Sequence, residues 1–363
     1  MRYQVRQQRL LELLRRHQAS GLLVTSLVNI RYLCGFTGSS GVLACRLDHG
    51  RRQLALFTDG RYRLQAREEV TGARIVIEKR SALEMAAEWV TGSGLTPIAI
   101  EAQHLSVAER DLVLKHRRHP NSRLKSTVGL IEQLRLVKDD QEMAAIRSAV
   151  NLGASLFDTA LNTIRPGVAE VRVAAEMEHA ARESGAEGMS FETIVAAGPR
   201  SALPHGHAST KPIPGRGFVV LDFGVILAGY CSDMTRTVHV GRPTTEEREM
   251  YEAVREAQGA GVDAVRAGVT AGEVDFAARS VLRRNRLDRF FTHSTGHGVG
   301  LEIHEPPRLA RREAEVLQPG MVVTIEPGVY VPGKGGVRIE DMVVVRENGC
   351  EVLTPGTKEL IEL

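Results

Sequence analysis

The sequence predicts an α/β protein of two domains, and three observations support this prediction. The chain has 363 residues, which is long for one hydrophobic core and comfortable for two. Through roughly the first 125 residues, short apolar runs alternate with amphipathic, helix-like segments. A long helical pattern that starts at Asp139 then opens a second series of helices, strands and hairpins. We therefore expect domains at residues 1–125 and 139–363, joined by a linker at 126–138.

The first domain is expected to begin with an amphipathic helix whose Leu10, Leu13 and Leu14 face inward. A buried strand at 22–25 follows, and then a turn, a glycine-flanked run and another strand. The next strand ends at Asp59. The remaining expected elements are a helix at 62–70, a strand at 74–78, a helix at 82–90 and a strand at 97–100. This alternation indicates a sheet with flanking helices, followed by a strand-like connector.

The second domain is expected to begin with a long helix. Asp139 is placed to cap free N–H groups at its start, and Glu142 in the first turn suits the positive end of the helix dipole. The run Arg165-Pro166-Gly167 ends the helix.

A sequence echo runs through the second domain. The segment R-P-G-V-A-E-V starts at Arg165 and R-A-G-V-T-A-G-E-V starts at Arg266. Each is expected to open a helix and to precede an aromatic-led strand, at Phe191 and at Phe291. Chance similarity between two glycine-ended helix junctions is one explanation. The other is a duplicated α/β unit whose halves face each other, with a site between them.

Composition excludes several classes of protein. Hydrophobic content of 43%, charged content of 25% and a net charge of +3 are ordinary for a soluble globular protein. The arginines at 283–286 favour a solvated helix face over a nucleic-acid site. No apolar run reaches the ~18 residues of a membrane span, and the N-terminus does not resemble a signal peptide. Four scattered cysteines favour reduced thiols, so we expect no membrane contact and a cytoplasmic location.

Five residues in the second half could form a two-metal hydrolytic site. Asp222 and Asp233 flank the turn 227–229, and a hairpin with the two aspartates opposite each other would bring both to one metal pair. An aspartate inside an apolar strand is costly unless it is paired or bound to a metal. The alternative is that both aspartates merely mark strand ends.

The other three candidates are His297, Glu326 and Glu340. His297 lies in a glycine-rich run that could also hold a satisfied core histidine, although His293 and His304 in the same stretch make this less attractive. Glu326 ends an apolar strand, and Glu340 follows another. Four carboxylates and one imidazole suit Mn²⁺, Co²⁺ or Zn²⁺. The complete set of candidate metal ligands is Asp222, Asp233, His297, Glu326 and Glu340.

The motifs that hold these residues resemble those of the pita-bread metallopeptidase family, which includes aminopeptidase P, prolidase and methionyl aminopeptidase. They are LDFG with SDMTRT, TGHGVGLEIHE, TIEPGVY and GGVRIED. In the first domain, RYLCGFTGSSG and TDGRYRLQA resemble the creatinase/prolidase-type N-terminal domain. The resemblance covers nearly the whole chain, and it implies this N-terminal domain followed by a pita-bread catalytic domain.

The resemblance also implies residue roles. Asp222, Asp233 and Glu340 would bind one divalent ion, and a second ion would be bound by Asp233, His297, Glu326 and Glu340. The further catalytic residues that it implies are His205, His293, His304 and Arg338. Glu326 would also move a proton from nucleophile to leaving nitrogen, and His205 and His304 would hydrogen-bond substrate carbonyl groups.

By resemblance the chain is a Xaa-Pro dipeptidase or aminopeptidase P, acting as a homodimer on small peptides with proline second and using two ions, with Mn²⁺ preferred. Methionyl aminopeptidase is an alternative, but it usually has glutamine in place of Arg338 and lacks the N-terminal domain. Creatinase-like hydrolases lose the metal ligands, which this chain keeps. A catalytically inactive binding or scaffold protein is the alternative from another class. The motifs leave open whether the substrate may extend beyond the proline.

Overall fold

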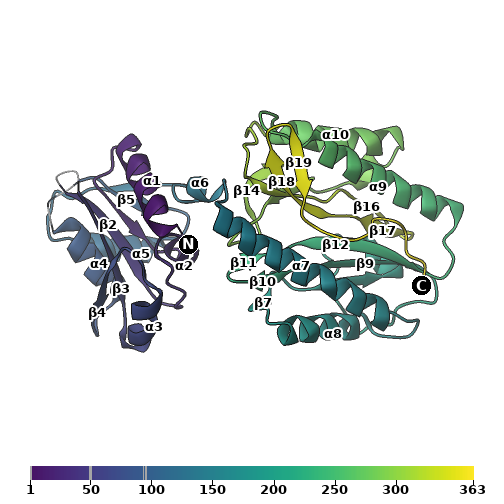
Figure 1. Ribbon diagram of the computed structural model, residues 1–363, viewed down its shortest axis with the longest axis horizontal. Helices are drawn as coiled ribbons and strands as arrows, with labels where there is room; N and C mark the ends of the chain where they lie inside the picture. Colours follow the sequence, from purple (N-terminus) through teal and green to yellow (C-terminus); the bar gives the residue numbers. More distant parts are fainter. Residues whose placement is uncertain (1, 49–50, 93, 95) are drawn as a thin grey trace. The chain divides into compact units, whose positions relative to one another are not determined.

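The chain folds into two compact α/β units, unit 1 (Met1–Arg135) and unit 2 (Leu136–Leu363) (Figure 1). The computed structural model describes residues 2–48, 51–92, 94 and 96–363. The expected α/β fold class is confirmed. Across these described residues, no helix combines the length and the apolar character that a membrane span requires. The four cysteines are all free thiols.

Unit 1 is built on one six-stranded sheet. Its elements are α1 (Tyr3–Arg16), β1 (Gly21–Val24), α2 (Leu27–Cys34), β2 (Val42–Asp48), β3 (Arg51–Thr58), α3 (Arg63–Glu69), β4 (Arg74–Ile77), α4 (Ala82–Thr91), β5 (Ile98–Glu101), α5 (Val107–Lys115), β6 (Leu124–Thr127) and α6 (Glu132–Arg135). The strand order is β4-β3-β2-β1-β5-β6. The apolar face of α4 packs on this sheet, and α1 buries Leu10, Leu13 and Leu14 as expected.

Three parts of unit 1 differ from the sequence-based expectation. The turn and glycine-flanked run expected after β1 are wrong, because α2 occupies this segment. Ser26 caps α2 by accepting a hydrogen bond from the backbone N–H of Asn29, and Gly35 ends it in the left-handed region at φ 88°. Helix α5 was not expected, although Ser106 and Glu109 form a capping box at its start. The connector expected to be strand-like contains the short helix α6.

Unit 2 contains four long helices and several short sheets. Its elements are α7 (Asp140–Thr163), α8 (Glu170–Glu183), β7 (Gly188–Met189), β8 (Ile194–Ala197), β9 (Gly217–Phe223), β10 (Val225–Leu227), β11 (Tyr230–Cys231), β12 (Met234–Val240), α9 (Thr245–Ala264), α10 (Ala271–Arg284), β13 (Gly296–Gly298), β14 (Glu305–Leu309), β15 (Val322–Ile325), β16 (Gly328–Val331), β17 (Gly335–Arg338), β18 (Asp341–Arg346) and β19 (Gly349–Val352). The strand orders of its sheets are β11-β10-β7, β12-β9-β8, β14-β13-β15-β18-β19 and β16-β17.

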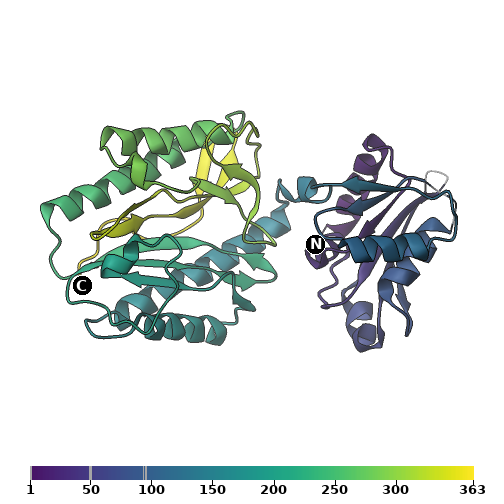
Figure 2. The same cartoon turned by 180° about the vertical axis from the view of Figure 1, so that it is seen from behind.

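The strands of unit 2 lie between two helix pairs, α7 with α8 on one side and α9 with α10 on the other (Figures 1 and 2). The α7–α8 pair shares one apolar core with β8, β9 and β12. The α9–α10 pair packs on the strands of the second half. This arrangement covers both outer faces of the sheets and leaves the strand ends free to carry functional side chains.

The two helix openings expected from the sequence echo are present. Gly167 at φ 88° precedes α8, and Gly268 at φ 84° precedes α10. The expectation that aromatic residues lead the following strands is wrong, because Phe191 and Phe291 lie before the strands, which start at Ile194 (β8) and at Gly296 (β13). Asp139 caps α7 by accepting hydrogen bonds from two backbone N–H groups, as expected.

Candidate active site and metal centre

The hairpin expected around residues 227–229 forms, but its register differs from the expected one. Asp222 pairs with Thr235 across β9 and β12, so the two aspartates are not opposite each other, and that expectation is wrong. Asp233 lies two positions before Thr235 and is therefore diagonal to Asp222 across the hairpin. A Cβ atom at Gly224 would lie 1.9 Å from the carbonyl oxygen of Ser232. The close approach of the two strands at this point therefore requires glycine.

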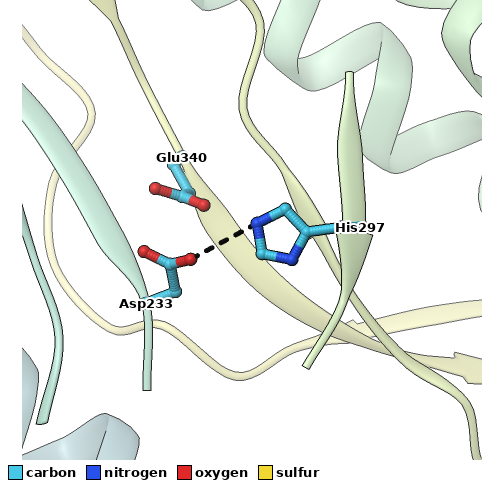
Figure 3. A group of neighbouring side chains, drawn as sticks. All are labelled: Asp233, His297 and Glu340. Atoms are coloured by element: carbon cyan, nitrogen blue, oxygen red, sulfur yellow. Dashed lines mark ion pairs between the residues drawn. The ribbon is translucent and has the colours of Figure 1, made fainter. Parts of the chain in front are cut away.

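Three of the expected metal ligands form a tight group. The ligand atoms of Asp233, His297 and Glu340 all lie within 4.8 Å of one another (Figure 3). Asp233 immediately precedes β12, His297 lies in β13, and Glu340 lies between β17 and β18. Segments from both halves of unit 2, within or next to strands, therefore bring these side chains to one point.

All nine expected site residues line a single cavity of about 700 Å³ in unit 2. His297 Nε2 lies 3.6 Å from Glu326 Oε1, which places Glu326 beside the group of Asp233, His297 and Glu340. The expected site residues that line the cavity are His205, Asp222, Asp233, His293, His297, His304, Glu326, Arg338 and Glu340. The structure thus brings together every side chain that the motifs singled out.

The carboxylates of this cavity repel one another in a dry environment. Burial raises the pKa of Asp233 well above its ordinary value, and the nearby Glu340 carboxylate adds to the rise. The pKa of Glu340 is also raised well above its usual range by burial and by Glu326. Burial raises the pKa of Glu326 to about 8. Such a cluster needs either protons or cations to be stable at neutral pH.

Three histidines of the cavity have lowered pKa values. Burial lowers the pKa of His297 to about 4 and, with help from the Arg338 charge, lowers the pKa of His293 to about 3. Burial also lowers the pKa of His304. His297 Nδ1 lies 3.0 Å from the carbonyl oxygen of Gly298, to which it can only donate, so its Nε2 carries a lone pair.

This geometry fits divalent metal ions. His297 Nε2 lies 3.6 Å from Asp233 Oδ2, which is too far for a hydrogen bond. This spacing suits two ligand atoms that share one cation. The Oδ1 atoms of Asp222 and Asp233 are buried and have no hydrogen-bond partner among the described residues. Buried carboxylate oxygens without donors are costly, and a cation would satisfy them. Oxygen and imidazole donors are those that Mn²⁺, Co²⁺ and Zn²⁺ accept.

Two residues that the sequence prediction missed hold Arg338 and Glu340 in place. The Tyr330 hydroxyl accepts a hydrogen bond from Arg338 Nη1 and lies 2.9 Å from His293 Nε2. The Thr235 hydroxyl accepts from Arg338 Nε at 3.1 Å and donates to Glu340 Oε2 at 2.7 Å. Both lie in the motifs TIEPGVY and SDMTRT. The motifs therefore contained the residues, but nothing in them indicated these contacts.

Arg338 itself is fully buried and forms an ion pair with Asp222. Its guanidinium bridges one candidate metal ligand and the hydroxyl groups of Thr235 and Tyr330. The bidentate and forked geometry of arginine suits this bridging role.

The mouth of the cavity has further residues that the sequence prediction did not single out. Phe191 lines it, and Glu192 Oε2 lies 3.1 Å from His207 Nδ1. Arg308 also lines the cavity, and no hydrogen bond or ion pair of its guanidinium is found among the described residues. In β14 it pairs across from His297. The positively charged guanidinium of Arg308 is therefore available to a substrate near the candidate metal ligands.

Two family models match the chain. Metallopeptidase family M24 matches residues 144–347, and the creatinase/prolidase N-terminal domain matches residues 6–137. The chain belongs to metallopeptidase family M24. This assignment confirms the expected family and the expected fold, an N-terminal creatinase/prolidase-type domain followed by a pita-bread domain. It also establishes the chain as a peptidase of a family that uses divalent metal ions.

Several similar proteins carry names of Xaa-Pro peptidases. The solved structure of a Xaa-Pro dipeptidase from Bacillus anthracis has a TM-score of 0.94 and 41% identity over 99% of this chain and 100% of that chain. The structure of an X-Pro aminopeptidase from Thermotoga maritima has a TM-score of 0.88 and 34% identity over 97% and 100%. A Xaa-Pro dipeptidase from Pyrococcus furiosus is 46% identical over 65% of this chain and 68% of its own length.

Proposed function

We propose that this metallopeptidase hydrolyses the bond between an N-terminal residue and a following proline, with dipeptides as its main substrates. The observation that carries the proposal is one cavity that holds five candidate metal ligands together with His205, His293, His304 and Arg338. The names of its similar relatives support the choice of Xaa-Pro substrates. The close grouping of the ligand atoms of Asp233, His297 and Glu340 supports metal binding.

The five ligands would hold two divalent ions. Asp222, Asp233 and Glu340 would hold one, and Asp233, His297, Glu326 and Glu340 would hold the other. Such ions polarise a carbonyl group and lower the pKa of water. Because the donors are mostly carboxylate oxygens, Mn²⁺ suits the site best, and Co²⁺ or Zn²⁺ can replace it.

The remaining side chains act on the peptide. Glu326 would take a proton from the attacking water and pass it to the leaving proline nitrogen, which becomes the amine of the released proline. His205 and His304 donate hydrogen bonds to substrate carbonyl oxygens, where negative charge develops. His293 is kept neutral by burial and accepts a hydrogen bond from Tyr330, which fixes Arg338 beside Asp222.

Arg308 favours substrates that end at proline. Its free guanidinium at the cavity can pair with the C-terminal carboxylate of a dipeptide. In a longer peptide the same position is a neutral amide, which cannot make this charge-assisted contact. We therefore assign the protein as a dipeptidase ahead of an aminopeptidase of longer Xaa-Pro peptides.

Further proposals concern the whole protein. Residues 1–125 form the creatinase/prolidase-type domain, 126–138 the linker and 139–363 the catalytic domain. The protein acts as a homodimer in the cytoplasm. Sedimentation of the purified protein tests the dimer, and a monomer at assay concentration contradicts it.

Turnover of Ala-Pro by the purified, metal-reconstituted protein tests the proposed function. We expect Mn²⁺-dependent release of alanine from Ala-Pro and much slower cleavage of Ala-Pro-Ala. Equal or faster cleavage of the tripeptide would assign the aminopeptidase activity instead. Met-Ala serves as the control for methionyl aminopeptidase activity. Absence of both metal binding and cleavage, in a folded protein, would support a non-catalytic binding protein and refute the proposal.

A further inference from the structure

A buried ion pair lies at one wall of the cavity in unit 2, and one of its partners, Glu305, is itself a lining residue. Lys138 Nζ lies 3.1 Å from Glu305 Oε2, and the two side chains are only 1% and 3% exposed. Lys138 immediately precedes Asp139, the N-cap of α7, and its backbone N–H donates to the carbonyl oxygen of Gly320 at 3.0 Å. The lysine is thus anchored by its backbone, and its side chain reaches a residue far away in the sequence.

The loop at residues 299–304 folds around the carboxylate that Lys138 contacts. Glu305 Oε1 accepts a hydrogen bond from the backbone N–H of Glu302 at 3.2 Å. A Cβ atom at Gly300 would lie 2.5 Å from the same oxygen, so the backbone passes directly against the carboxylate. The carbonyl oxygen of Gly300 accepts from the N–H of Cys231 at 2.8 Å. The position of the loop therefore depends on where Glu305 is held.

The same loop carries His304 to the cavity. His304 is the residue immediately before Glu305, and its ring meets the ring of His297 edge-on, with centroids 4.5 Å apart. Ile303 of the loop lines the cavity as well. A shift of the Glu305 carboxylate would therefore move His304 relative to His297.

Stability alone explains this ion pair poorly. Removing two charges from water costs about as much as their attraction returns, so apolar side chains of similar size often stabilise a core as well or better. An ion pair with ordered hydrogen bonds does specify one geometry, and here that geometry belongs to a loop at the cavity.

We propose that Lys138 is a positioning residue, which acts through Glu305 to hold the loop 299–304 and thereby set the place of His304 in the cavity. The effect on catalysis rests on the proposed function. The effect on the loop does not, because it concerns the packing of the chain itself.

Four variants test this role. Lys138→Met removes the charge at similar size, and Glu305→Gln removes the partner charge. The double variant Lys138→Met with Glu305→Gln leaves no unpaired buried charge and so guards against simple misfolding. Leu156→Ala is the control, because Leu156 is buried on α7 in the core shared with α8, and its loss destabilises without touching Lys138 or Glu305.

Two readouts separate positioning from structure. We expect hydrogen–deuterium exchange of the backbone at 299–305 to accelerate in the metal-free Lys138→Met and double variants and to stay unchanged in Leu156→Ala. In metal-replete protein we expect kcat for Ala-Pro to fall about 10- to 100-fold in the same two variants, as is typical for residues that orient a site. The double variant should recover the thermal midpoint while kcat stays low.

Parental exchange at 299–305 in a folded Lys138→Met or double variant would overturn the proposal. Recovery of kcat together with the thermal midpoint in the double variant would also overturn it, because the pair would then serve stability alone. If the parent protein does not cleave Ala-Pro, the proposed function fails, and the exchange measurement still decides the role of Lys138.

Discussion

Stripping the metal ions from this peptidase should make unit 2 less stable as the pH rises from 5 to 8. In the metal-free cavity Glu326 and Glu340 lie close together in a dry environment, and burial raises the pKa of both carboxyl groups. A folded-state pKa above the unfolded value favours the protonated, folded form. The stabilisation is therefore complete below the unfolded pKa and is lost as the pH rises through the folded pKa.

The size of the effect follows from Glu326. Its pKa rises from 4.5 to about 8 on folding. Each pKa unit corresponds to about 1.4 kcal/mol, so this one group lowers the free energy of unfolding by about 5 kcal/mol between pH 4.5 and pH 8. Metal binding reverses the trend, because the ions bind deprotonated carboxylates and stabilise the folded form by about 2.7 kcal/mol at a hundred times Kd.

The two units allow an internal control. The single tryptophan, Trp89, lies in unit 1, whereas all of the carboxylates concerned lie in unit 2. Denaturant titrations at pH 5, 6.5 and 8 in a chelator would follow Trp89 fluorescence for unit 1. Hydrogen exchange of peptides from β12 and β15 would follow unit 2. We expect the exchange of unit 2 to accelerate with pH beyond its intrinsic chemical rate, and the Trp89 midpoint to change little.

The variant Glu326→Gln should remove much of this pH dependence, because it removes one of the titrating groups at similar size. In the metal-free state at pH 8 it should be more stable than the parent protein. Stability of unit 2 that is flat or increases from pH 5 to 8 in the metal-free parent would refute the reasoning. So would a Glu326→Gln protein that keeps the full slope.

Three further mutations give sharp outcomes. Arg308→Gln should raise KM for Ala-Pro about tenfold, because it removes one charge-assisted contact with the substrate carboxylate. The KM for Ala-Pro-Ala should change little. Equal effects on both substrates would contradict the proposed binding of the carboxylate by Arg308. Arg236→Met should cost about 1–3 kcal/mol in denaturant unfolding, because it leaves the carbonyl oxygens of Thr357 and Glu340 without this donor, while Asp341 keeps its ion pair with Lys358. Asp139→Ala should cost about 1 kcal/mol by removing the N-cap of α7 while leaving kcat unchanged. A cost near zero for either stability variant would show that water replaces the lost partner.

Local signals in the sequence predicted elements well where a chemical marker stood at the boundary. Asp139 with Glu142 marks the start of α7, and both residues make the expected capping contacts. The segment of α2 shows the opposite case. The glycines that follow it suggested turns, whereas Ser26 and a buried face at helical spacing form a helix. A short helix in an apolar segment has no periodicity long enough to distinguish it from a strand.

The nine site residues were predicted because their types are chemically costly inside apolar strands and because they match a family pattern. Their place in one cavity is a property of the fold, and so are the partners of Arg338. Tyr330 and Thr235 are ordinary strand residues in sequence, and only the approach of separate strands makes them hydrogen-bond partners of Arg338.

By itself the sequence determined the α/β class and the family and singled out the candidate site residues, because residue type and short-range pattern carry that information. Tertiary structure alone decided the diagonal placement of Asp222 and Asp233 and the pairing of Lys138 with Glu305. It also decided the raised pKa of Glu326. The first depends on the register of a hairpin, which the turn and the packing of its two faces set. The ion pair and the raised pKa depend on the approach of segments far apart in the chain and on how completely packing excludes water.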